Sequence, residues 1–102
     1  MNDAEKWAAY DLAKNRLSLV ISHYSELVFN EQQKTAPDLA QIEKWEAEQI
    51  ATLRQRARLS VTDQVKIQAL NRDLEPVIKE ILSQGKNTNG AVQPLRANSS
   101  RA

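Results

Sequence analysis

Three arginines, Arg54, Arg56 and Arg58, form the only local concentration of positive charge, in the segment Leu-Arg-Gln-Arg-Ala-Arg-Leu. Such a run can bind phosphate groups, so it is a candidate contact for a nucleic acid or another anion. On a helix, Arg54 and Arg58 share a side, whereas Arg56 points elsewhere. Cations near a helix C-terminus also complement the negative end of the helix dipole. Two interpretations therefore stay open, an anion-binding surface and a stabilised helix end.

Catalytic chemistry would have to centre on His23, the single histidine, which lies beside Ser22 and Tyr24. Side chains this close along a helix radiate in different directions, so they cannot converge on one substrate atom. The chain has no cysteine, so a metal site would need carboxylates alone, and the glutamates do not repeat the Glu-x-x-His pattern of di-iron bundles. We therefore expect no enzymatic activity, no metal and no cofactor.

Residues 50–70 also allow a helix-turn-helix interpretation, because a bend is expected at 59–62 and the helix that follows would begin with the polar side chains Ser60, Thr62 and Gln64, which could reach bases or phosphates. Against it, the turn lacks a glycine and Asp63 would bring negative charge to the nucleic acid. A small dimeric DNA-binding regulator that uses the arginine run is thus the alternative function.

The composition predicts an all-α protein. The 102 residues include only two glycines and three prolines, with 41% hydrophobic and 26% charged residues, which is typical of one globular domain. The first residues are acidic and the longest apolar run, residues 19–21, is far too short for a signal core or a membrane span. We therefore expect a cytoplasmic protein without a membrane segment. The net charge of +1 neither favours nor forbids an anionic partner.

Apolar spacing predicts a long first helix over residues 2–34, which Asn2 and Glu5 would cap at its start. A tight connection at 35–38 should follow, with Thr35 or Ala36 as the next cap and Pro37 in the first turn of the second helix. The expected core positions of the first helix are Tyr10, Ala13, Leu17, Val20, Tyr24 and Leu27, and those of the second are Leu39, Ile42, Ile50, Leu53 and Ala57, with Glu46 among them.

The third helix shows the same three-and-four spacing, at Ile67, Leu70, Leu74, Val77 and Ile81. Its apolar stripe is out of phase with that of the second helix, so we expect a break at 59–62, with Ser60 and Asp63 as a capping pair. Pro76 should kink this helix and Gly85 should end it. Residues 1–85 would then form one helical hairpin or three-helix bundle, and 86–102 a disordered, weakly basic tail.

Geometry favours self-association. A first helix of about thirty residues would span about 45 Å, whereas the other two would reach only about 35 Å, so apolar side chains would remain uncovered. Leu12 and Leu19 lie off the main stripe and Trp7 and Trp45 at the stripe edges, which makes these four residues interface candidates, although isolated surface leucines are also common. We expect a homodimer or higher homo-oligomer that also binds a protein partner as an adaptor or regulator.

Overall fold

The computed structural model describes residues 1–92, which form three helices: α1 (Asp3–Gln32), α2 (Leu39–Arg58) and α3 (Gln64–Val92). No strand occurs in this part of the chain. The all-α prediction and the separation of the second and third helices are confirmed. Residues 93–102 of the predicted tail lie outside the described residues.

The first helix is continuous over 30 residues. Its predicted capping box is present: the side chain of Asn2 accepts a hydrogen bond from the Glu5 amide at 2.8 Å, and the Glu5 carboxylate accepts one from the Asn2 amide at 2.9 Å. These bonds satisfy amides that have no partner inside the helix. The long first helix is therefore confirmed.

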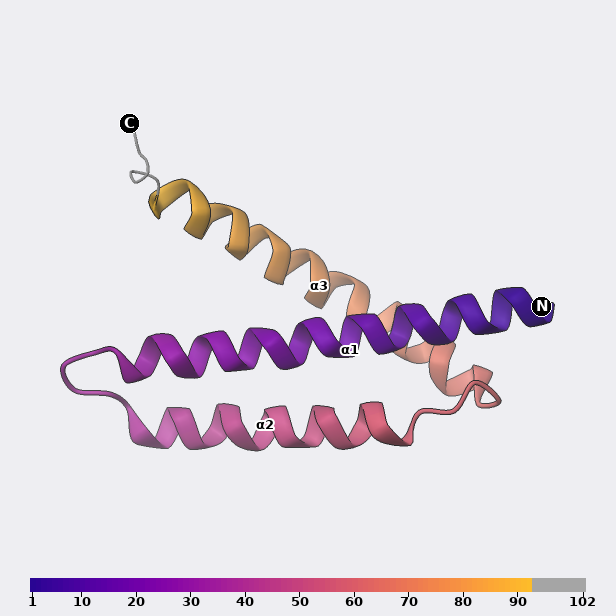
Figure 1. Ribbon diagram of the computed structural model, residues 1–102, viewed down its shortest axis with the longest axis horizontal. Coiled ribbons are helices and arrows are strands. Elements are labelled where there is room, and N and C mark those ends of the chain that lie inside the picture. Colours follow the sequence, from indigo (N-terminus) through magenta and orange to yellow (C-terminus); the bar gives the residue numbers. More distant parts are fainter. Residues whose placement is uncertain (93–102) are drawn as a thin grey trace.

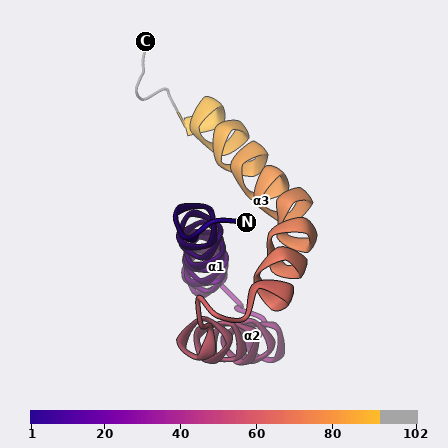
Figure 2. The same ribbon diagram turned by 90° about the vertical axis from the view of Figure 1, so that its right-hand side faces the viewer.

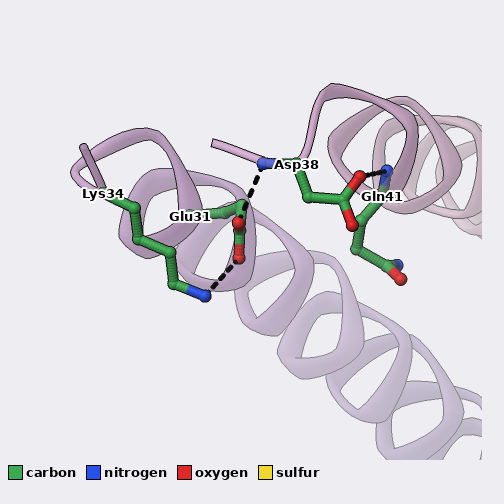
Figure 3. Close-up of polar contacts among 4 residues, drawn as sticks. All are labelled: Glu31, Lys34, Asp38 and Gln41. Atoms are coloured by element: carbon green, nitrogen blue, oxygen red, sulfur yellow. Dashed lines mark hydrogen bonds and ion pairs between the residues drawn. The ribbon is translucent and has the colours of Figure 1, made fainter. Parts of the chain in front are cut away.

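The connection between α1 and α2 is built on Glu31, whose carboxylate is buried and bridges both sides of the turn (Figure 3). Lys34 pairs with Oε1 at 2.8 Å, and the Asp38 amide donates to Oε2 at 3.0 Å. Asp38 in turn accepts a bond from the Gln41 amide at 3.0 Å and caps α2. The prediction of Thr35 or Ala36 as the cap is wrong, because the aspartate carboxylate is the acceptor that reaches the free amides.

The cap at the connection between α2 and α3 also differs from the predicted capping pair of Ser60 and Asp63. The side chain of Asp63 accepts the Lys66 amide at 3.2 Å at the start of α3, while the Ser60 hydroxyl bonds Thr62. Helix α3 then runs unbroken through Pro76 and continues to Val92, seven residues beyond the end predicted at Gly85. The predicted kink at Pro76 stays a prediction.

Helix α1 is the centre of the molecule. Figure 1 shows α2 running antiparallel beside α1, and α3 crossing α1 and then diverging from it. In the turned view, α2 and α3 lie against different sides of α1 (Figure 2). The molecule measures 50 × 34 × 17 Å, so it has room for no more than two helix layers.

The hydrophobic core lies between the amino-terminal half of α1, the connection at Leu59 and the first part of α3. Its fully enclosed side chains are Leu17 and Ile67, packed with Ala13 and Leu59. Two polar contacts fix the crossing of α3: the Asn71 amide donates to the Ala9 carbonyl at 3.0 Å, and Arg16 donates to the Asn71 carbonyl. The core therefore covers only part of the apolar stripe of α1.

Candidate interaction surfaces

The face of α2 that lies against α1 carries polar side chains together with Ile42 and half-buried Trp45. Ile42 is its one buried apolar side chain. The Gln49 amide donates to the Ile21 carbonyl at 2.9 Å and to the Ser25 hydroxyl. The Arg56 guanidinium donates to the Ser18 hydroxyl at 2.8 Å. Hydrogen bonds thus hold much of this interface.

The apolar face of α2 is turned about 90° away from α1 and is exposed. Leu39 is 74% exposed, Ile50 48% and Leu53 49%, and Ala57 is exposed beside them. Of the core positions predicted for this helix, only Ile42 is buried. The prediction of a core face here is wrong, because α1 offers hydroxyls and carbonyls to α2 and the polar face of α2 bonds them. We call the residues Leu39, Ile50, Leu53 and Ala57 the α2 stripe.

A second apolar surface is the groove of about 450 Å³ between the diverging halves of α1 and α3. Val20, Tyr24 and Leu27 line it from α1, and Val77 and Ile81 from α3, with His23 and Glu80 among the polar lining residues. Val77 is 42% exposed, although its spacing predicted a core position. The apolar stripes of α1 and α3 therefore continue past the closed core into an open groove.

Tyr24 in this groove has a pKa raised above its ordinary value, first because burial disfavours the phenolate and second because the Glu48 carboxylate repels it. The phenol is therefore neutral at physiological pH. It offers a hydroxyl beside the apolar lining.

The arginine run does not form one patch. Arg54 and Arg58 are exposed, and neither side chain has a hydrogen bond or ion pair within the described residues. Arg56 is half-buried and donates to Ser18 and to the Lys14 carbonyl on α1. The predicted division is confirmed: two arginines share the open side and the third is directed elsewhere.

The four predicted interface residues lie in different surroundings. Leu12 and Leu19 are 43% and 40% exposed on α1. Trp7 is 53% exposed, stacks edge-on against Tyr10 at 5.5 Å, and lines a small cleft with Thr62 and Gln64. Trp45 is half-buried on α2. The structure does not bring these residues together on one surface.

Sequence reasoning did not single out Glu31 or Gln49. Lys34 first, and then the Asp38 amide, hold the pKa of the Glu31 carboxyl below its ordinary value of 4.5 by hydrogen bonding to the charged form. The sequence shows Glu31 three residues before Lys34, a spacing at which the two side chains can pair on a helix. The bond from the Asp38 amide to Glu31 could not be predicted, because it depends on the shape of the turn. Gln49 carried no signal at all, because its partners are 24 and 28 residues away.

Gln64, which the helix-turn-helix interpretation would place on the nucleic acid, is half-buried against α1. Its amide donates to the Lys6 carbonyl at 3.4 Å and to the Val61 carbonyl. The side chain is therefore engaged inside the molecule. This leaves Arg54 and Arg58 as the exposed cations of the alternative interpretation.

Residues 1–92 contain no cluster of three or more histidine, cysteine or carboxylate side chains placed to hold a metal ion. No helix in that part of the chain has the length and apolar character needed to cross a membrane. No family model, curated protein or solved structure matches the chain.

Proposed function

We propose that the protein is a non-enzymatic helical interaction module that self-associates and binds a further macromolecule as an adaptor or regulator. The observation that carries the proposal is the exposed α2 stripe. Ile50 and Leu53 each leave about half of their surface in water, and Leu39 leaves 74%. Covering such apolar area stabilises an association by about 25 cal/mol per Å² before the costs of ordering are subtracted.

The thin shape of the molecule supports the same proposal. With no more than two helix layers, residues 1–92 have no element left to cover the stripe, since α2 and α3 contact different sides of α1. Contiguous exposed apolar residues of this kind mark interaction surfaces in folded proteins. Self-association would remove them from water without any change in the fold.

The groove between α1 and α3 is the surface we assign to the other macromolecule. Its apolar floor and open side fit a segment of a partner protein that presents apolar side chains at helical spacing. Val77 and Ile81 would be covered by such a segment. Because the groove and the α2 stripe lie on different helices, both could be occupied at once.

Sedimentation equilibrium over a micromolar concentration series tests the self-association. We expect the apparent mass of the wild type to rise with concentration. The double variant Ile50→Gln/Leu53→Gln should shift this rise to concentrations at least about tenfold higher, because polar amides replace the apolar contacts. A matched control is Leu12→Gln/Leu19→Gln, which replaces two leucines of similar exposure on α1.

The control should leave the association unchanged. A folded wild type that stays monomeric at every concentration would contradict the proposal. Equal loss in both double variants would contradict the assignment to α2.

A second candidate function, binding of nucleic acid, is favoured by one observation: the guanidinium groups of Arg54 and Arg58 are exposed and unpaired within the described residues. Binding of duplex DNA that weakens steeply with salt, and loses about one unit of log-log slope for each arginine replaced, would support it. Binding without salt dependence would contradict it.

A further inference from the structure

We infer that the α2 stripe is covered by the α2 helix of a second copy of this chain, in antiparallel orientation about a two-fold axis. This inference rests on the proposed self-association and specifies its geometry. Its evidence is the distribution of charge along α2, which complements itself only when one helix is reversed.

The two halves of α2 carry opposite charge. The first ten of its 20 residues hold Glu43, Glu46 and Glu48 with one base, Lys44. The last ten residues hold three arginines and no acid. In an antiparallel pair the acidic half of each helix lies against the basic half of the other, whereas a parallel pair in register brings like charges together.

The charges that matter flank the stripe on one side. Glu43 and Arg54 both lie within about 70° of the centre of the stripe, in the same rotational sense. A two-fold axis perpendicular to an antiparallel pair brings the same flank of each helix together. An axis that passes between Glu48 and Gln49 therefore sets Glu43 level with Arg54 of the second copy, and does so twice. Glu46 lies about one helical turn further along α2 than Glu43, and it is within reach of the same Arg54 of the second copy.

The apolar residues agree with this register. Ile50 lies close to the axis, so the two copies of this side chain meet near the centre of the pair. Leu39, the most exposed leucine of the stripe, comes level with Arg58 of the second copy, about 1.5 Å along the axis from the small Ala57. A small residue opposite a large one lets two helices approach closely. The seam would therefore bury the most exposed apolar side chain of α2.

The groups needed for this pairing are available. The side chains of Glu43, Glu46 and Arg54 are exposed, and none forms a hydrogen bond or ion pair within residues 1–84. Arg56, by contrast, is engaged on α1 at 2.8 Å from the Ser18 hydroxyl. Glu43 and Arg54 are thus free beside the stripe and Glu46 is free within it, whereas the engaged Arg56 lies on the contact face.

Charge reversal tests the pairing. Arg54→Glu and Glu43→Arg should each weaken the self-association of the full chain about tenfold, because each puts like charges together at two places in the dimer. An equimolar mixture of the two variants should associate about as tightly as the wild type, because both pairs then regain opposite charges. The double variant Glu43→Arg/Arg54→Glu, measured alone, should also associate about as tightly as the wild type.

Lys44→Glu is the matched control, since it makes the same change in charge at an exposed position about 140° around α2 from the stripe. It should leave the association within about twofold of the wild type. If Lys44→Glu weakens the association as much as Arg54→Glu, net charge is the cause and the pairing is wrong. If the wild type self-associates and Arg54→Glu has no effect, the pairing is wrong while the proposed function stands. A wild type that never associates overturns both.

Cross-linking tests the orientation separately, because the chain has no cysteine of its own. In the antiparallel pair the two copies of residue 47 are about 5 Å apart along the helix axis, and those of residue 57 about 25 Å. A short bismaleimide reagent should therefore link Ala47→Cys chains into covalent dimers and leave Ala57→Cys chains as monomers. Efficient linking of Ala57→Cys would indicate a parallel pair and overturn the inference. Folding of each variant is checked by circular dichroism.

Discussion

Hydrophobic burial alone would turn the apolar face of α2 toward α1 and leave the polar face in water, but the two faces are arranged the other way round. The face that packs against α1 is held by Gln49 and Arg56, while the face with Ile50 and Leu53 lies in water. The contact face bonds to carbonyls and hydroxyls of α1, which an apolar stripe could not satisfy. The comparison teaches that an amphipathic pattern predicts a helix without predicting which neighbour its apolar face meets.

The largest expected difference in the free energy of unfolding is between a substitution in the core of α1 and one in the α2 stripe. Leu17→Ala should lower the free energy of unfolding by about 2–5 kcal/mol, because Leu17 is 1% exposed and its truncation leaves a cavity. Leu53→Ala should cost less than about 1 kcal/mol in the monomer, since half of that side chain is in water already. Urea denaturation at a concentration below the onset of association measures both. A similar loss for the two would show that the stripe is packed.

The contact face should give an intermediate effect. The double variant Gln49→Ala/Arg56→Ala is expected to lose about 2 kcal/mol, because it removes the side-chain hydrogen bonds that join α2 to α1. Its counterpart Arg54→Ala, on the open side, should change the free energy of unfolding by less than about 0.5 kcal/mol. Equal effects in urea denaturation would contradict the assignment of the polar face as the contact.

The smallest effect is expected at the turn between α1 and α2. Because the pKa of Glu31 is lowered in the folded state, its carboxylate stabilises the fold at pH values above the ordinary pKa of 4.5, and this contribution is lost as the pH falls through the lowered value. Glu31→Gln should therefore lower the free energy of unfolding at neutral pH, and the difference from the wild type should vanish in acid.

The matched control for this pH dependence is Glu26→Gln, an exposed glutamate on the same helix without a side-chain bond. Its difference from the wild type should stay small at every pH. A pH-independent loss in Glu31→Gln would show that the side chain acts through packing rather than charge.

Much of the fold could be predicted from local pattern. The capping box at Asn2, the length of α1 and the break before Asp63 depend on residues close together in the sequence, and all are present. The core positions Ala13, Leu17 and Ile67 also follow from helical spacing. These features need no knowledge of which helices become neighbours.

The features that could not be predicted depend on distant partners. Both the choice of the polar face of α2 and the divergence of α3 follow from bonds such as Gln49 to Ile21 and Asn71 to Ala9, which join residues 28 and 62 positions apart. Nothing in the local sequence marks these pairs. For the same reason the helical spacing of Val77 predicts a buried position, whereas the structure places this residue in the open groove.

The central claim is that the α2 stripe is free in the single chain and covered when chains associate. The most direct test is a concentration series of methyl and amide nuclear magnetic resonance spectra with assigned signals. We predict that concentration-dependent shifts concentrate at Leu39, Ile50 and Leu53 and leave Leu12 and Leu19 unchanged. Shifts confined to those two leucines of α1, or no shifts at any concentration, would contradict the account.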